Sequence, residues 1–247
     1  MTLHRFYIEP ARWDPACLEL DEAESRHASE VLRLREGDLV SVFDGRGDEI
    51  HARVSQQSKR HTSLTAESHH HQAAPSARLL LAQAIPKGKN MDLVLQKATE
   101  LGATDILPLL TERTVVRLDP DEAADKQEKW QRMVIEACKQ CGQNHLPRVH
   151  LPQTIGSFLQ NLPEAGLLLI AALTPEARPL QKILSGSADR PASALVLIGP
   201  EGDFTPAETD AAQAAGCQAL SLGPLILRTE TAAVYALSIL RHELSRD

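Results

Sequence analysis

The residues best suited to chemistry lie near the C-terminal end of the chain, in the segment 222–232, LGPLILRTETA. Thr229 or Glu230 can begin the last helix, where the helix dipole favours a negative charge. Arg228 would then stand just outside the helix N-terminus, where it can hold a phosphate or a carboxylate by paired hydrogen bonds. The alternative role for Arg228 is a surface salt bridge.

Three loops follow the most apolar predicted strands, and they read ALTPEA (172–177), GPEGDF (199–204) and GPLILRTET (223–231). In open α/β sheets, ligands bind at the carboxyl ends of the strands. Glycine lets the backbone approach a ligand closely, and proline holds a turn rigid. A single Gly-Pro turn is commonly structural, but two on successive buried strands favour a ligand site. Their backbone groups suit the edge of an adenine ring.

Other common catalytic patterns are absent from the sequence. No GxGxxG follows a strand, and there is no GxxxxGK[ST], GxSxG or HExxH. Cys138 and Cys141 form a CxxC at the end of a helical pattern, where the dipole disfavours a thiolate. We therefore expect buried or half-buried structural thiols and no metal site.

The charge of the chain limits the classes of partner. The 247 residues carry a net charge of −7, with 43% hydrophobic and 24% charged residues. Residues 1–72 hold 9 basic and 13 acidic side chains and residues 73–247 hold 17 and 20, so the two parts carry −4 and −3. This balance excludes a nonspecific nucleic-acid coat protein, but it allows an enzyme with a local basic patch.

The sequence also indicates where the protein resides. No apolar run approaches the ~18 residues of a membrane span. The N-terminal residues lack the basic start and apolar stretch of a signal peptide. We expect a soluble, cytoplasmic protein.

The secondary structure predicted for the elements that position these loops differs between the two parts of the chain. Before residue 72 the pattern predicts short strands (3–8, 39–43, 49–56 and 64–67) and one helix. That helix opens at Asp21, with Glu24 completing a capping box, and stops by Gly37. Residues 68–77, SHHHQAAPSA, lack hydrophobic periodicity and predict a solvated linker; metal binding is the alternative for His69–His71.

After the linker, strands and helices alternate, which predicts an α/β fold with a parallel sheet and helices on both faces. Asp119 with Pro120, and Thr205 with Glu208, are helix-start signals. The expected strands are 78–85, 104–110, 166–172, 194–198 and 217–222, and the expected helices are 90–101, 120–141, 154–162, 177–184, 205–215 and 231–244.

Six segments together resemble one family. They are RFYI (5–8), HASEVLRLREGD (27–38), KATELGATDILPL (97–109), EACKQCGQNHLP (136–147), IGPEGDF (198–204) and LGPLILRTETA (222–232). In order and in combination, they resemble the SPOUT-class methyltransferases, specifically the family that methylates N3 of a uridine in 16S small-subunit rRNA.

The resemblance implies a fold, a cofactor and partners. Residues 1–72 would form a PUA-like RNA-binding β-barrel. Residues 73–247 would form a SPOUT domain whose chain end threads into a deep trefoil knot. The family implies a homodimer that binds S-adenosylmethionine in the knot, near the partner subunit. Carried over by motif, the cofactor-binding residues are Leu173, Thr174, Gly199, Pro200, Glu201, Gly202, Leu222, Gly223, Leu225, Ile226, Leu227 and Thr231.

The resemblance also suggests a catalytic set of Arg228, Glu230 and Glu201. Arg228 would stabilise charge that develops on the uracil carbonyl oxygens. Glu230 or Glu201 would accept the proton of uridine N3. Glu201 can equally be a loop-closing carboxylate that accepts hydrogen bonds from backbone N–H groups.

Local basic clusters are the candidates for RNA contact, namely Arg26, Arg33, Arg35, Lys87, Arg113 and Arg117. Arg26 and Arg33 are seven residues apart and can share a helix face. The sequence departs from the family at Gln143, where the family commonly has an arginine after glycine and before Asn144. If the family's arginine contacts RNA, this chain must use another residue for that contact or bind RNA more weakly there.

Two alternatives remain at this point. One is a noncatalytic RNA-binding or ribosome-assembly module that kept the fold, and the other is a SPOUT methyltransferase acting on another RNA position. The resemblance implies 16S rRNA as the substrate, and the acidic charge predicts that it is presented in a defined structure, that of an assembled small ribosomal subunit.

Overall fold

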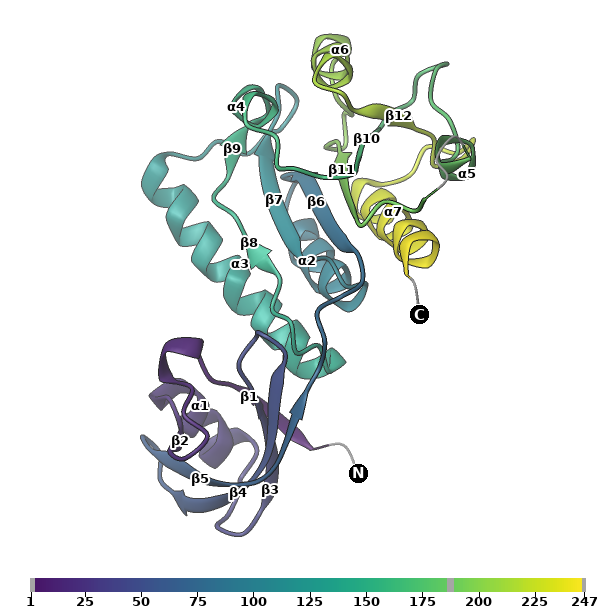
Figure 1. The fold of residues 1–247 in the computed structure, drawn as a ribbon. Helices are drawn as coiled ribbons and strands as arrows, with labels where there is room; N and C mark the ends of the chain where they lie inside the picture. The colour runs from purple at the N-terminus through teal and green to yellow at the C-terminus, as the bar shows by residue number, and fades with distance from the viewer. Residues whose placement is uncertain (1–2, 186–188, 246–247) are drawn as a thin grey trace. The chain divides into compact units, whose positions relative to one another are not determined.

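The computed structural model describes residues 3–185 and 189–245, which form two units of different architecture (Figure 1). One unit comprises the chain up to residue 74 together with residues 135–146. The other comprises residues 75–134 and the chain from residue 147 onward. The unit boundary at 74 lies next to the expected boundary at 72, and the N-terminal unit also takes in a segment from later in the chain.

The first unit is built on a mixed sheet in the strand order β1-β3-β4-β5-β2. Strands β1 and β3 are parallel, and the other pairs are antiparallel. One sheet face and the helical segment enclose a core that includes Phe6, Leu18 and Val40. The elements are β1 (His4–Tyr7), β2 (Leu18–Leu20), α1 (Glu22–Arg26), β3 (Leu39–Phe43), β4 (Asp48–Gln57) and β5 (Thr62–His71).

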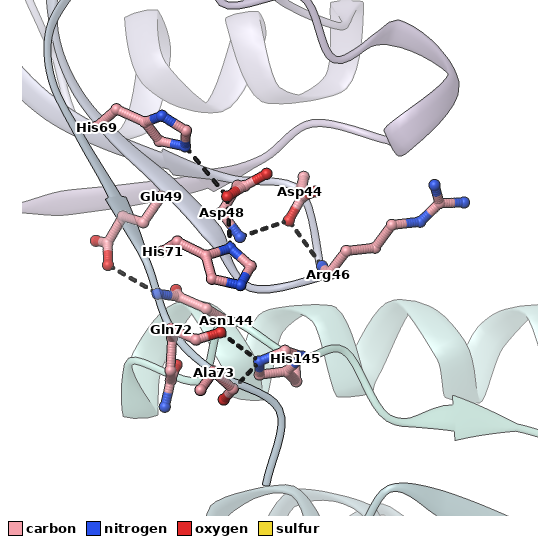
Figure 2. Close-up of polar contacts among 10 residues, drawn as sticks. All are labelled: Asp44, Arg46, Asp48, Glu49, His69, His71, Gln72, Ala73, Asn144 and His145. Atoms are coloured by element: carbon pink, nitrogen blue, oxygen red, sulfur yellow. Dashed lines mark hydrogen bonds and ion pairs between the residues drawn. The ribbon is translucent and has the colours of Figure 1, made fainter.

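Strand β5 runs through the histidine triplet, so the predicted linker is wrong for residues 68–71. The backbone pairs with β4, and Asp48 lies opposite His71. Figure 2 shows the rings of His69 and His71 directed at the Asp48 carboxylate, with nitrogens 3.1 and 2.7 Å from Oδ1. The bond with His71 is the main cause of the lowered pKa of Asp48. Cross-strand bonding thus orders a segment that lacks hydrophobic periodicity.

The first helix differs from its prediction after one turn. Asp21 caps it as expected by accepting a hydrogen bond from the Glu24 N–H at 2.7 Å. After Arg26 the chain forms a π-helical turn over His27–Val31, and Arg33 then takes a left-handed conformation at φ 55°. The expected helical face shared by Arg26 and Arg33 is therefore wrong, because the two residues are not on one regular helix.

Residues 135–146 contact the N-terminal part of the first unit through polar side chains. Lys139 Nζ lies 2.9 Å from Glu24 Oε1. Asn144 is buried and accepts a hydrogen bond from Arg5 at 2.5 Å. It donates one to Glu49 at 2.9 Å, as Figure 2 shows. His145 Nε2 lies 2.9 Å from the Gln72 carbonyl oxygen. These contacts explain why a segment distant in sequence belongs to this unit.

The cysteine prediction is confirmed for one member of the CxxC pair and wrong for the other. Cys138 is buried, and burial raises the pKa of its thiol to about 12. Cys141, the last residue of its helix, is exposed. Neither cysteine forms a disulfide.

The second unit is an α/β unit with a parallel sheet in the order β12-β10-β11-β6-β7-β8, and β9 also pairs with β7. The predicted parallel sheet is confirmed. The strands are β6 (Arg78–Ala84), β7 (Asp105–Leu110), β8 (Arg148–Val149), β9 (Gln153–Thr154), β10 (Leu167–Ala171), β11 (Ser193–Ile198) and β12 (Gln218–Leu220). The helices are α2 (Asn90–Glu100), α3 (Pro120–Cys141), α4 (Ile155–Gln160), α5 (Leu180–Leu184), α6 (Pro206–Ala214) and α7 (Thr229–Leu244).

Helices cover both faces of this sheet. Leu80 and Ala82 of β6 join a core cluster with Phe158 of α4 and Ala212 of α6. Because successive side chains of a strand alternate between faces, Leu79 and Leu81 point the other way. Helices α2 and α7 pack against each other, and α7 also packs on β6 and β11. The central strands are therefore apolar on both faces, as their sequences predict.

The helix-start signals of this unit act as expected. Thr205 and Glu208 form the reciprocal capping box of α6. Asp119 accepts a hydrogen bond from the Glu122 N–H at 2.8 Å at the start of α3. The predicted helix 177–184 is wrong in its first turn, since α5 begins only after the extended Pro179. No helix among the described residues is long and apolar enough to cross a membrane.

Candidate functional site

A cavity of about 510 Å³ lies at the carboxyl ends of β10, β11 and β12. The loops 172–177, 199–204 and 221–227 surround it, and the first turn of α7 closes one side. The lining residues are Ala171, Ala172, Leu173, Thr174, Ala177, Ile198, Gly199, Pro200, Glu201, Gly202, Asp203, Leu220, Ser221, Leu222, Gly223, Leu225, Ile226, Leu227, Thr229 and Ala232. The three loops singled out in the sequence therefore meet at one cavity.

Every residue that the resemblance assigned to the cofactor lines this cavity except Thr231. Helix α7 begins at Thr229, so Thr229 and Ala232, three residues apart, share the face toward the cavity. Thr231 lies on another face and is exposed. The cofactor-binding residues carried over from the family motif did not include Thr229 and Ala232, whose direction is determined by the start of α7 at Thr229.

The cavity combines apolar walls with a polar group that has no partner. Leu225 and Ile226 are 72% and 85% exposed. The hydroxyl of Thr174 is buried, and it has no hydrogen-bond partner among the described residues. A buried hydroxyl without a partner costs about 1–3 kcal/mol, so this position favours a ligand that supplies the missing hydrogen bond.

A chain of hydrogen bonds fixes the floor of the cavity. The buried Gln83 of β6 donates to the hydroxyl of Thr229 at 3.0 Å. That hydroxyl donates to the carbonyl oxygen of Gly199 at 2.6 Å. The bonds connect a central strand, the start of α7 and the 199–204 loop. A Cβ at Gly199 would lie 2.9 Å from Asp203 Oδ1 and 3.2 Å from the Phe204 backbone nitrogen, so the tight turn leaves little room for a side chain there.

The 199–204 loop is also held by groups from two neighbouring loops. Glu201 Oε1 accepts a hydrogen bond from the backbone N–H of Lys87 at 2.8 Å. This contact matches the loop-closing alternative for Glu201. Arg113 donates to the carbonyl oxygens of Gly202 and Phe204 at 2.6 and 3.3 Å. Lys87 and Arg113, both expected to contact RNA, thus also border the cavity loop.

Arg228 and Glu230 lie beside the cavity without lining it. Arg228 is the residue before α7 and is exposed, and Glu230 is half-buried in the first turn. Within residues 3–185 and 189–245, neither side chain has a hydrogen-bond or ion-pair partner. Both remain available to a substrate at the rim of the cavity.

The other residues expected to contact RNA are exposed but lie on different units. Arg26, Arg33 and Arg35 belong to the first unit, and Arg26 forms an exposed ion pair with Glu22 at 3.0 Å. Arg117 belongs to the second unit. In the described part of the chain, no group of three or more His, Cys, Asp or Glu side chains has the arrangement of a metal site.

Comparisons with known proteins match both units. A family described as RNA methyltransferase domain matches residues 73–241, and one described as RNA methyltransferase PUA domain matches residues 20–65. A Synechocystis protein named ribosomal RNA small subunit methyltransferase E is 34% identical, covering 95% of this chain and 76% of its own length. A Bacillus subtilis protein of the same name is 30% identical and covers 98% and 97%.

Solved structures with the same architecture include two with a bound cofactor. A Legionella pneumophila protein solved with SAM (S-adenosylmethionine) is 33% identical, with a TM-score of 0.89 over 98% of both chains. A Neisseria gonorrhoeae ribosomal RNA small subunit methyltransferase E bound to S-adenosylmethionine is 32% identical. Its TM-score is 0.86 over 98% of both chains.

Proposed function

Because the chain belongs to the RNA methyltransferase family that includes ribosomal RNA small subunit methyltransferase E, we propose that it methylates N3 of a specific uridine in 16S rRNA, with S-adenosylmethionine as the methyl donor. The observation that carries the proposal is the cavity at the carboxyl ends of β10, β11 and β12. It is formed by the loops that contain the family motifs.

The cavity has the properties that S-adenosylmethionine requires. Its volume of about 510 Å³ lies within the roughly 300–1,000 Å³ of small-molecule sites. Leucine and isoleucine side chains offer apolar surface for the adenine and ribose, and the backbone of the Gly-Pro loops offers hydrogen bonds to the adenine edge. The unpartnered hydroxyl of Thr174 is available to a polar group of the cofactor.

The residues of the chain supply alignment and charge stabilisation. When bound, S-adenosylmethionine provides an electrophilic methyl group on a sulfonium. The bonds among Gln83, Thr229 and Gly199 hold the cavity walls in place, which favours alignment of the reacting atoms. Arg228 stabilises the negative charge on the uracil carbonyl oxygens as N3 loses its proton.

We assign the proton acceptor to Glu230. Uridine N3 is a weak nucleophile while it carries its proton, so a base must remove it. Glu201 has one carboxylate oxygen engaged by the Lys87 N–H, which supports a loop-closing role. Glu230 has no such partner among the described residues and follows Arg228 by only two positions.

The finer fold is also part of the proposal. We propose that the end of the chain passes through a deep trefoil knot in the second unit. The resemblance of residues 198–204 and 222–232 to the SPOUT-class methyltransferases supports this. We further propose that the sheet of the first unit closes into a PUA-like β-barrel, which the match to a PUA domain over residues 20–65 supports.

The expected partners are a second copy of the chain and a structured RNA, in the cytoplasm. With a net charge of −7, the chain is expected to bind bare RNA weakly when no specific site is present. The exposed Arg33, Arg35 and Arg117 supply local positive charge. We propose that the substrate is 16S rRNA within an assembled small ribosomal subunit, where shape and local contacts determine recognition.

The test measures methylation of small ribosomal subunits that lack the modification, and maps the methylated nucleotide. Arg228→Ala and Glu230→Gln are each expected to lower the methylation rate about 100-fold or more, with S-adenosylmethionine binding by calorimetry unchanged. Arg132→Met, a change to an exposed arginine of α3, is the control.

Normal turnover in both variants would contradict the catalytic assignment. Methylation at another nucleotide would favour the second enzyme hypothesis. If the unaltered chain does not bind S-adenosylmethionine, the noncatalytic RNA-binding module is the better description.

A further inference from the structure

The loop after β7 begins with a rigid turn. Thr111 and Thr114 are both buried, and their hydroxyls lie 2.8 Å apart. The Thr111 N–H donates to the Thr114 hydroxyl at 3.1 Å, and the Thr114 N–H donates to the Thr111 carbonyl at 3.2 Å. The side chains of the turn thus satisfy its own backbone, which presents the two residues between them, Glu112 and Arg113, in a fixed direction.

Arg113 extends from this turn onto the 199–204 loop. Its Nη1 donates to the carbonyl oxygens of Gly202 and Phe204 at 2.6 and 3.3 Å. The aliphatic stem of Arg113 lies against Gly202, where an added Cβ would be 3.3 Å from Cδ of the arginine. Both the charged group and the stem therefore contact the same stretch of the loop.

The neighbouring residue fixes the far end of that stretch. The backbone N–H of Glu112 donates to Glu208 Oε1 at 2.8 Å. The other oxygen of Glu208 accepts a hydrogen bond from the Thr205 N–H at 2.8 Å in the capping box of α6. The turn after β7 therefore holds the end of the 199–204 loop and the start of the next helix together.

Two neighbouring loops, those after β6 and β7, thus brace the cavity loop. Lys87, in the loop after β6, binds Glu201 through its backbone. Arg113, in the loop after β7, binds Gly202 and Phe204. Pro200, Glu201, Gly202 and Asp203 all line the cavity, so a change in these bonds would change the wall that a ligand meets.

We propose that Arg113 is a positioning residue: it holds the carbonyl groups of Gly202 and Phe204 so that the 199–204 loop keeps the shape that binds the cofactor. This inference rests on the proposed function, because it takes S-adenosylmethionine as the ligand. It replaces the expectation that Arg113 acts through contact with RNA. The guanidinium acts on the cavity wall before any RNA is bound.

The test measures S-adenosylmethionine binding by calorimetry without RNA. Arg113→Met keeps the stem and removes both hydrogen bonds, so the Kd is expected to rise about tenfold or more. Arg113→Lys keeps the positive charge but replaces the planar guanidinium with an ammonium group. It is therefore expected to retain cofactor binding only in part. Arg132→Met removes an exposed arginine that has no hydrogen bond or ion pair within residues 3–185 and 189–245, and it is expected to leave the Kd unchanged.

A second readout separates positioning from loss of fold and from failure of the proposed function. In the free protein, hydrogen exchange at the amides of 202–204 is expected to be faster in Arg113→Met, while the thermal midpoint stays close to that of the unaltered chain. An unchanged Kd and unchanged exchange would overturn the inference. If the unaltered chain binds no S-adenosylmethionine, the proposed function fails, and the exchange measurement still decides whether Arg113 holds the loop.

Discussion

At the level of single residues, Asp105 at the start of β7 is a carboxylate with three side-chain hydrogen-bond partners. His150 Nε2 lies 2.9 Å from Oδ1, and Thr104 and Arg78 donate to Oδ2 at 3.0 and 3.2 Å. Burial acts to raise the pKa of Asp105, but the hydrogen bonds from His150, Thr104 and Arg78 outweigh it and lower the pKa below 3.8. The folded state therefore favours the ionised carboxylate.

The lowered pKa of Asp105 predicts a loss of stability in acid. As the pH falls through the ordinary value near 3.8, the unfolded chain takes up a proton that the folded chain does not, so the free energy of unfolding decreases until the pH reaches the lowered pKa. Asp105→Asn is expected to lower the free energy of unfolding by about 1–3 kcal/mol at neutral pH. That difference should shrink between about pH 5 and about pH 3 in urea unfolding experiments. A difference that is constant over this range would contradict the role of the carboxylate.

At the level of elements, helix α3 covers the edge of the parallel sheet with two glutamine side chains. Gln131 accepts a hydrogen bond from the Val149 N–H and donates to the Pro147 carbonyl oxygen, both at 2.9 Å. Gln127, one turn earlier, donates to the Val149 carbonyl oxygen at 2.9 Å. The amides take the place of a further strand beside β8, where unpaired backbone groups would otherwise remain.

Loss of this edge cover is expected to destabilise the second unit. Gln131→Leu leaves the Val149 N–H and the Pro147 carbonyl without their glutamine partner. The free energy of unfolding, measured by chemical denaturation, should fall by about 1–3 kcal/mol. The amide of Val149 should also exchange faster with solvent. Arg132→Ala, at the adjacent exposed position, should change stability by about 0.5 kcal/mol or less. Equal stabilities of the two variants would show that the glutamines are dispensable.

At the level of the whole molecule, the second unit exposes large apolar side chains on two of its helices. Leu93 of α2 and Tyr235 of α7 are 43% and 45% exposed, on two helices that pack against each other. Exposed apolar side chains that gather on neighbouring helices can form the contiguous patches that mark contacts with another protein. They support the proposal of a homodimer formed through the second unit.

Light scattering at micromolar concentration is expected to give the mass of two chains. Tyr235→Glu places a charge on α7 and should shift the protein toward the monomer, because a charge without a partner at an apolar interface is costly. Val31→Glu alters a side chain that is 65% exposed in the first unit and should leave the mass unchanged. A monomeric mass for the unaltered chain would contradict the dimer.

Much of the second unit was predictable from the sequence, because its signals are local. Apolar runs gave the central strands, and Thr205 with Glu208 gave the start of α6. The rule that ligands bind at the carboxyl ends of parallel strands then located the cavity loops. The errors arose where nonlocal bonds override local pattern, as in the histidine strand that pairs with β4 and the π-helical turn before Arg33.

By itself, the sequence determined the parallel α/β sheet, the loops that carry its ligand site and the family to which the chain is similar. Only the tertiary structure decided that residues 135–146 belong with the first unit, that Thr229 and Ala232 face the cavity, and that Glu201 and Arg113 brace its wall. The physical reason is distance along the chain. Strand periodicity and helix caps are set by residues a few positions apart, whereas Arg113 and Gly202 meet only after the sheet has brought the ends of β7 and β11 together.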